Sequence, residues 1–405
     1  MKFIHTADLH IDQPFANVTT DDAGFQQELQ QVNHAVLKKI VNQCIEESVD
    51  FLLVVGDTFH QARSSIYTQE FIMNEFKRLE EYGIQVIMSF GNHDYYTENR
   101  YWFEWPENVT LFTKEEVTTK VITLKNNEAV AISGFSYEHQ WITQDKALDY
   151  PERDLDTTYH IGLYHGEIGS TGQYAPFLVS ELNPRYDYWA LGHIHKSEKI
   201  STHPLAIYPG IPQGHTKKEK NGQGIVLVEV ESNQVDYRFI PVSIVGFETI
   251  EMTLKEDLER HLYLSKLIAG MAQKDWACPI NFVTVVVKPV TGQLMSELIA
   301  EKEEILHYLQ TKLLQQTAGN IWLMDLVIES VETDKLIMGF DASLIDDLSA
   351  PFAKKDEFYK LAKDILQQPV IAANIQFDEE DVKLMVQEST QLVKDKMIFK
   401  NEASQ

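Results

Sequence analysis

Five short clusters of Asp, His and Asn side chains stand out in the first half of the chain. They are DLH at 8–10, GDTFH at 56–60, GNHD at 91–94, HG at 165–166 and GHIH at 192–195. Carboxylate oxygen, imidazole nitrogen and amide oxygen form a mixed ligand set that suits Mn²⁺, Fe²⁺ or Zn²⁺ and suits Cu⁺ poorly. The residue types therefore predict a divalent metal site.

The spacing within the clusters indicates a pair of ions. His193 and His195 are two positions apart, so an extended loop can aim their rings at adjacent points, and Asp8 and His10 share that spacing. Asp57 stands alone after its apolar run and is the natural bridge, because a carboxylate has two oxygens. Two ions roughly 3.5 to 4 Å apart can clamp a phosphoryl group and activate water for in-line attack.

Buried strands and amphipathic helices must position these clusters. Short apolar runs that end in turns predict strands at 3–7, 51–55, 86–90, 129–133, 160–164 and 188–191, and helical spacing of apolar residues predicts helices at 30–48 and 67–82. In open α/β sheets the loops at the carboxyl ends of strands meet at one edge, so the five clusters can converge there. His5, inside the first strand, is predicted to be a buried, hydrogen-bonded core residue rather than a ligand.

Three domains are predicted along the chain, at 1–245, 246–335 and 336–405. Closely spaced strands at 206–208, 224–231 and 234–241 suggest a second, partly antiparallel sheet in the first domain. The middle domain reads as a small α/β unit with strands at 247–254, 282–290 and 321–330 and helices at 255–271 and 293–316. The last part has two amphipathic segments, 344–367 and 379–397, separated by Pro369.

Composition and charge exclude several classes of protein. Apolar residues make up 44% and charged residues 24% of the 405, which excludes disorder as the main state. Cys44 and Cys278 are the only cysteines, so a disulfide framework and a cysteine-type zinc site are both excluded. The chain has no apolar run long enough to span a membrane, and its first residues, MKFIHTADLH, do not resemble a signal peptide. We therefore expect a cytoplasmic protein that does not enter the membrane.

The net charge of −26 sets a condition on any nucleic-acid partner. Non-specific affinity for DNA comes from Lys and Arg that neutralise phosphates, and this chain carries an excess of acidic residues. A polyanion would need bound cations, a local basic patch or a second subunit. Twelve of the 14 histidines lie before residue 216, so the chemistry is expected in the first domain.

The motifs GD-x-x-H, GNHD and GH-x-H, in this order, resemble those of the calcineurin-like metallophosphoesterase superfamily. The opening FIHTADLH, the GDTFH and the YPGIPQG at 208–214 resemble, more narrowly, the SbcD-type DNA-repair nuclease subunits. The resemblance covers residues 3–214. It implies an α/β fold, a two-sheet metallophosphoesterase sandwich flanked by helices, followed by a small α/β capping domain and C-terminal helices.

The resemblance also implies two ligand sets that share Asp57. One ion would be held by Asp8, His10, Asp57 and His195, and the other by Asp57, Asn92, His165 and His193. The implied ions are divalent, with Mn²⁺ preferred over Fe²⁺ or Zn²⁺.

Three further residues receive catalytic roles from the resemblance. His93 would face the scissile phosphate as general acid or transition-state donor, and His60 matches the second active-site histidine of the nuclease branch. Asp94 could either orient His93 or cap its own loop. Asp12 lies outside the matched positions and receives no role.

The implied function is a metal-dependent DNA phosphodiesterase, an exonuclease or endonuclease of DNA repair. It would act as the nuclease half of a complex with a coiled-coil ATPase of the SbcC or YhaN type, and as a homodimer. The C-terminal segments would dock on that ATPase or fold back on their own chain. Two alternatives remain: a phosphatase or phosphodiesterase of small molecules or nucleotides, which the acidity favours, and a non-catalytic subunit, which the intact ligand positions disfavour.

Overall fold

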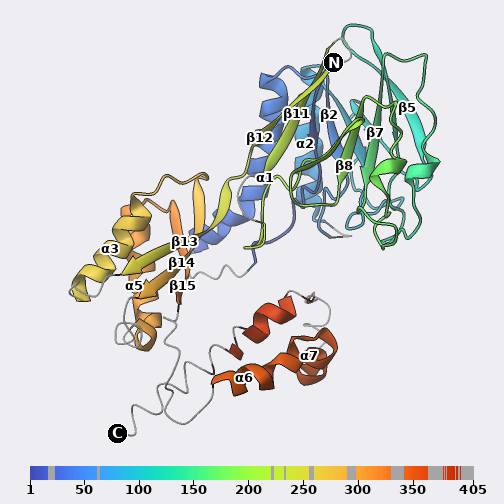
Figure 1. The fold of residues 1–405 in the computed structure, drawn as a ribbon. Helices are drawn as coiled ribbons and strands as arrows, with labels where there is room; N and C mark the ends of the chain where they lie inside the picture. Colours follow the sequence, from blue (N-terminus) through green and yellow to red (C-terminus); the bar gives the residue numbers. More distant parts are fainter. Residues whose placement is uncertain are drawn as a thin grey trace. The chain divides into compact units, whose positions relative to one another are not determined.

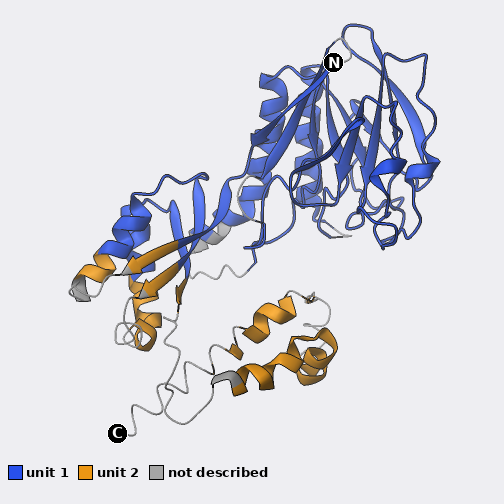
Figure 2. Ribbon diagram, in the orientation of Figure 1, with its two compact units in different colours: residues 1–250, 266–285, 309–325 blue, residues 251–265, 286–308, 326–405 orange. Residues whose placement is uncertain are grey.

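The computed structural model describes residues 1–16, 23–61, 64–219, 223–231, 234–254, 260–289, 298–329 and 342–363, with 377, 379, 381–387, 389, 390 and 393. Two compact units make up the chain, and Figure 2 shows them in different colours. The first unit comprises Met1–Ile250, Lys266–Val285 and Leu309–Asp325, and the second comprises the remaining segments. The units alternate along the chain, and the points where one gives way to the other fall inside the strands and helices that follow residue 244. The predicted domain boundaries near 245 and 335 therefore stay predictions.

The first sheet has six strands in the order β12-β11-β1-β2-β3-β4. Its strands are β1 (Lys2–Thr6), β2 (Phe51–Val55), β3 (Gln85–Ser89), β4 (Val109–Leu111), β11 (Gly224–Glu231) and β12 (Gln234–Pro241). Strands β1 to β4 run parallel, whereas β11 and β12 join antiparallel. Helices α1 (Ala23–Glu46) and α2 (Ile66–Glu81) connect the parallel strands, which confirms the predicted alternation of strands and helices.

The second sheet also has six strands, in the order β5-β6-β7-β8-β10-β9. Its strands are β5 (Thr118–Thr123), β6 (Ala129–Gly134), β7 (Tyr159–His165), β8 (Tyr188–Gly192), β9 (Glu198–Thr202) and β10 (Leu205–Tyr208). The four central strands are parallel and the two edge strands are antiparallel.

One prediction about the sheets is wrong. The spacing of 224–231 and 234–241 predicts that both join the second sheet, but β11 pairs with β1 and extends the first. The alternating side chains of β11 explain this placement. Ile225 and Leu227 belong to the core that contains the helices, whereas Val226 and Val228 belong to the core between the sheets. The sequence identifies the hairpin, but nothing local specifies which sheet it extends.

The two sheets pack face to face, with α1 and α2 on the outer side of the first sheet (Figure 1). Strand β2 is fully buried, with Phe51, Leu53 and Val55 facing the second sheet and Leu52 and Val54 facing the helices. Each such buried side chain contributes about 1.5–3 kcal/mol of transfer free energy. These layers confirm the predicted two-sheet α/β fold and fix the strand ends that carry the five clusters.

A third sheet follows, in the order β13-β14-β15, with strands at Val245–Leu254, Ile280–Pro289 and Ile321–Ile328. Helices α3 (Arg260–Ala272) and α5 (Lys302–Gln316) alternate with these strands as predicted. The predicted starts of both helices, at 255–259 and 293–297, lie outside the described residues.

The predicted helix 344–367 is divided. Helix α6 (Ala342–Ser349) passes into a 3₁₀ turn at Ala350–Ala353, and α7 (Lys355–Leu361) follows. The break falls at Pro351, which lacks the N–H that would continue the helix. Pro369 lies outside the described residues, and 381–387 are helical. Among the helices that the structure describes, none combines the length and the apolar content that crossing a bilayer requires.

Candidate metal centre

The ends of five strands carry the predicted site residues to one place. Parallel strands β1, β2 and β3 lie side by side in the first sheet, and β7 and β8 lie side by side in the second. Their C-terminal loops bring together all ten predicted residues: Asp8, His10, Asp57, His60, Asn92, His93, Asp94, His165, His193 and His195.

Four of the predicted ligands have left-handed backbone conformations. The φ angles are 51° at Asp8, 39° at His10, 51° at Asp57 and 100° at His193. Such a conformation costs a non-glycine residue about 1–2 kcal/mol. Conformational strain of this kind concentrates at functional sites, where the surrounding structure holds it in place. The loops are held together by backbone hydrogen bonds from Asp8 N to Gly56 O and from His10 N to Asp57 O.

The first group of ligand atoms comes from Asp8, His10 and His195, all within 4.8 Å of one another. The Nε2 atoms of His10 and His195 are 3.2 Å apart, and His195 Nε2 is 4.0 Å from Asp8 Oδ1. Asp8 Oδ2 also accepts the backbone N–H of His193 at 3.0 Å, which fixes the carboxylate.

The second group comes from Asp57, His165 and His193, with Asn92 beside them. The Nδ1–H of His165 donates to the Val55 carbonyl at 3.0 Å, which leaves Nε2 as the inner atom. That Nε2 lies 3.1 Å from Asn92 Oδ1 and 3.4 Å from Asp57 Oδ2. Three acceptor atoms that face one another need a proton or a cation between them.

Asp57 links the two groups. Its Oδ2 lies 3.4 Å from His165 Nε2 and 3.8 Å from His10 Nε2, while Oδ1 accepts the backbone N–H of His93 at 2.9 Å. One buried carboxylate thus faces an imidazole from each group. The residues present fit two divalent ions, because the inner atoms are nitrogen and oxygen acceptors arranged around a shared carboxylate.

Burial and neighbouring charges set the protonation of this site. Burial alone would raise the pKa of Asp57, but the adjacent His165 holds it well below its usual value. Burial opposes the charge on His165, yet the Asp57 carboxylate raises the pKa of that imidazole to about 9. Burial raises the pKa of Asp8 to about 6 and lowers that of His193 to about 3. A proton on His165 therefore occupies a position that a metal ion would take.

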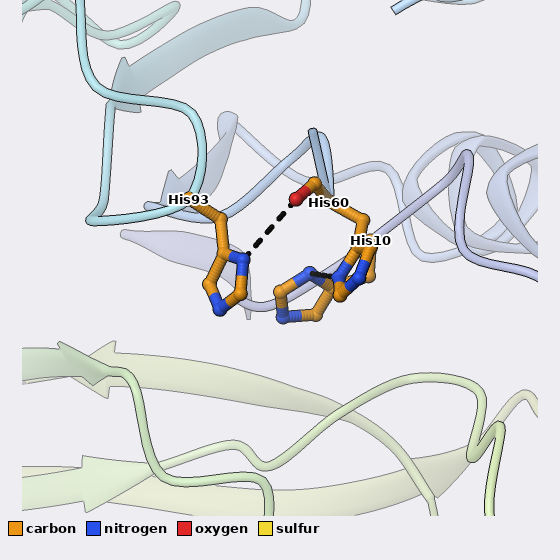
Figure 3. Close-up of side chains that lie close together, drawn as sticks. All are labelled: His10, His60 and His93. Atoms are coloured by element: carbon orange, nitrogen blue, oxygen red, sulfur yellow. Dashed lines mark hydrogen bonds between the residues drawn. The ribbon is translucent and has the colours of Figure 1, made fainter. Parts of the chain in front are cut away.

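His60 and His93 lie next to His10 at the edge of the site (Figure 3). The His93 Nδ1–H donates to the backbone carbonyl of His60 at 3.1 Å, so its Nε2 is the outward nitrogen. The two rings stack with centroids 5.0 Å apart, and His60 Nδ1 is 3.3 Å from His10 Nδ1. Both rings are half-buried.

The carboxylate of Asp94 binds backbone rather than the His93 ring. Oδ1 accepts the N–H groups of Gly91 at 2.7 Å and Asp57 at 3.2 Å, and Oδ2 accepts that of Thr58 at 2.8 Å. Of the two roles left open by the sequence, these bonds correspond to loop capping. The ring of His93 is oriented instead by the His60 carbonyl.

Three supporting residues carry no predicted role. Asp12 Oδ1 accepts the backbone N–H of His60 at 2.6 Å, and Glu219 Oε1 lies 2.5 Å from His195 Nδ1. Arg100 donates to the carbonyls of Tyr95 at 2.8 Å and Gln61 at 2.7 Å, which joins the two histidine loops. A sequence signal exists only for Asp12, an acidic residue two positions after a predicted ligand.

Comparison with known proteins gives a family match for the first half of the chain. Residues 1–197 match the family model described as calcineurin-like phosphoesterase. The chain is 37% identical to the "Uncharacterized metallophosphoesterase YhaO" of Bacillus subtilis over 244 residues, which are 59% of this chain and 60% of that protein. It is 24% identical over 352 residues to the "DNA double-strand break repair protein Mre11" of Methanopyrus kandleri, covering 75% and 72% of the two chains.

A third relative belongs to the nuclease SbcCD of Staphylococcus saprophyticus. It is 20% identical over 290 residues, with 65% of this chain and 74% of that protein covered. The chain thus spans less than two thirds of the Bacillus subtilis protein and about three quarters of the other two. The resemblance that the motifs indicate, including a kinship with YhaO, is confirmed. The five motif clusters at the ends of two packed sheets and the family match agree, and residues 1–197 form a calcineurin-like metallophosphoesterase domain.

Proposed function

We propose that this protein is a two-metal-dependent DNA phosphodiesterase that works in DNA repair. The observation that carries the proposal is the half-buried pair His60 and His93, stacked beside the two ligand groups. A plain phosphatase has no evident need for the second ring. The proposal is also supported by relatives whose names describe a nuclease and double-strand break repair proteins.

The residues of the site divide the chemical work. When bound, a pair of divalent ions supplies Lewis-acid polarisation of the phosphoryl oxygens and lowers the pKa of water. Asp8, His10, Asp57 and His195 would hold one ion, and Asp57, Asn92, His165 and His193 the other. Mn²⁺ is the ion that we propose.

His93 is the group that we assign to the leaving oxygen. Its Nδ1–H is engaged with the His60 carbonyl, so the ring can donate from the outward nitrogen, Nε2, only when that nitrogen carries a proton as well. In that protonated form, Nε2–H can donate to the oxygen that departs from phosphorus. The backbone carbonyl of His60 holds the His93 ring in this orientation, and the His60 ring stacks on the His93 ring.

The charge of the chain and its C-terminal helices support a partner. At a net charge of −26 the protein has little capacity to bind DNA by itself. A coiled-coil ATPase of the SbcC or YhaN type would provide the DNA-binding affinity. Helices α6 and α7 expose Leu344, Leu348 and Leu361, at 45%, 64% and 67%, as apolar contacts for such a partner. We propose a homodimer for the nuclease itself.

The test is a cleavage assay with Mn²⁺ on three substrates: end-labelled DNA, a phosphodiester dye and a phosphomonoester dye. We expect the wild type to cut DNA and the diester, and His93→Ala to lose about 10²- to 10⁴-fold in rate while still binding Mn²⁺. His139→Ala is the matched control, because that ring is 81% exposed. Turnover of the monoester alone would support the small-molecule phosphatase instead. No turnover, even with the ATPase partner added, would support a non-catalytic role in the complex.

A further inference from the structure

We propose that Glu219 is a positioning residue that fixes the tautomer and direction of His195 and so sets the affinity of the Asp8–His10–His195 group for its metal ion. The inference rests on the metal site of the proposed function but not on its specificity for DNA. Glu219 lies 24 positions after His195, in a loop that no motif marks.

Both carboxylate oxygens of Glu219 are engaged. Oε1 accepts from His195 Nδ1 at 2.5 Å. Oε2 accepts the backbone N–H groups of His215 at 2.8 Å and Thr216 at 3.2 Å. The side chain is only 13% exposed, so water competes weakly for these bonds. The backbone at His215 and Thr216 therefore holds the carboxylate in place while the carboxylate binds His195, which lies on the loop after β8.

This contact determines which nitrogen of His195 is available. An ionised carboxylate only accepts hydrogen bonds, so Nδ1 must carry the proton and Nε2 must present its lone pair. That Nε2 lies 3.2 Å from His10 Nε2 and 4.0 Å from Asp8 Oδ1. A carboxylate on the far nitrogen of a metal-binding histidine also makes the ring a stronger ligand, and its loss costs about 10- to 100-fold in metal affinity.

The loop that carries Glu219 is also held by hydrogen bonds that do not involve the Glu219 carboxylate. A positioning role of this carboxylate can therefore be tested separately from a role in holding the loop. The His215 carbonyl accepts the Ala16 N–H at 2.9 Å, and His215 Nε2 lies 2.9 Å from Asn33 Oδ1. The Glu219 carbonyl accepts from Gln223 Nε2 at 2.6 Å. None of these three bonds uses the Glu219 carboxylate, so we expect Glu219→Gln to keep the loop in place.

The experiment is a calorimetric titration of the full chain with MnCl₂, for the wild type and Glu219→Gln. Glu198→Gln is the matched control, because it removes the same charge from an exposed residue three positions after His195. We expect two binding steps in the wild type and the control. In Glu219→Gln one step should weaken about 10- to 100-fold while the other keeps its affinity.

Two further measurements isolate the mechanism. In ¹⁵N-histidine NMR spectra, we expect a downfield Nδ1–H proton signal from His195 that is present in the control and absent in Glu219→Gln. The unfolding midpoint without metal should match that of the control. Equal weakening of both steps together with a lowered midpoint would overturn the positioning role, since the loop as a whole would have shifted. Unchanged steps would also overturn it, while leaving the metal site of the proposed function intact. A wild type that binds no Mn²⁺ would overturn both.

Discussion

At the scale of single residues, buried carboxylates hold the ligand loops by accepting backbone N–H groups. Asp94 joins the loop after β3 to the loop after β2, because it accepts from Gly91, Asp57 and Thr58. Asp12, which is only half-buried, fixes the backbone of His60 in the same manner. These acids do not touch the inner ligand nitrogens, yet they determine where those nitrogens point.

Asp94→Asn should destabilise the protein by about 3 kcal/mol, because its amide NH₂ would face buried backbone N–H groups and leave donors unpaired. Burial, together with the charge of Asp57, raises the pKa of Asp94 to about 6, so the measurement is made at pH 8, where this carboxylate is ionised. Urea unfolding followed by circular dichroism gives the free energy. Asp156→Asn, at an exposed position, should stay within about 0.5 kcal/mol of the wild type. Equal stabilities of the two variants would contradict the capping role.

His5 provides a pH-dependent prediction away from the ligands. Its Nδ1 accepts from Tyr188 Oη at 2.9 Å, its Nε2–H donates to the Leu191 carbonyl at 3.1 Å, and burial lowers its pKa to about 3. The unfolded chain, with a histidine pKa of about 6.5, binds an extra proton below that pH. Folding stability therefore falls as pH drops from about 6.5 toward 3, by up to about 1.4 kcal/mol per pH unit.

The glutamine of His5→Gln does not titrate. The free energy of unfolding of this variant should therefore fall less steeply than that of the wild type as the pH decreases, by up to about 1.4 kcal/mol per pH unit. Urea unfolding at pH 4.5, 5.5 and 6.5 in EDTA measures both slopes, and parallel curves for wild type and variant would refute the assignment. The prediction that His5 is a buried, hydrogen-bonded core residue is confirmed by the structure.

At the scale of elements, strand ends are shaped to make room for the His165 imidazole. A Cβ on Gly56, directly after β2, would lie 2.2 Å from His165 Nδ1, and one on Gly192, the last residue of β8, would lie 2.7 Å from the same atom. Gly56 also has a φ of 78°, which a side chain disfavours. The ring thus fits between these strands of different sheets because a glycine stands where each strand ends or directly after it.

Gly56→Ala should cost about 1–3 kcal/mol more than Gly319→Ala, since overpacking adds to backbone strain. Gly319 is the matched control because its φ is 83° and a Cβ there would meet nothing within 4 Å. Gly56→Ala should also weaken Mn²⁺ binding, because His165 must move off the Val55 carbonyl. Urea unfolding and calorimetry test the two effects, and similar losses in both variants would show that backbone strain alone is responsible.

The elements also show what local sequence can predict. The strand predicted at 51–55 has its observed bounds, and the predicted helix 67–82 is observed one residue earlier at Ile66–Glu81, because apolar periodicity and turn residues are local signals. The edge strand β9 escapes prediction, since its side chains are largely exposed and polar. The pairing of β1 with β11 joins residues more than 200 positions apart, and the contact of Glu219 with His195 is equally invisible in one dimension.

At the scale of the whole molecule, the net charge of −26 bears on how strongly this chain alone can bind DNA. Phosphate contacts provide most of the affinity of non-specific complexes, and here acidic side chains outnumber basic ones by 61 to 35. We therefore expect the chain alone to bind DNA with a Kd weaker than about 10⁻⁵ M at physiological salt. Fluorescence anisotropy with labelled duplex in EDTA measures this. Tight binding by the isolated chain would remove the need for an ATPase that holds the DNA.

The placement of the predicted ligands on both sheets has a consequence for stability. Asp8 and His193 are 185 residues apart in sequence but adjacent in space, one at the end of a first-sheet strand and the other at the end of a second-sheet strand. Ions held between such positions would stabilise the folded sandwich alone, because these ligands separate when the chain unfolds and then release the metal. A chelator would then lower the free energy of unfolding of the sandwich, because it would remove the ions that join one sheet to the other.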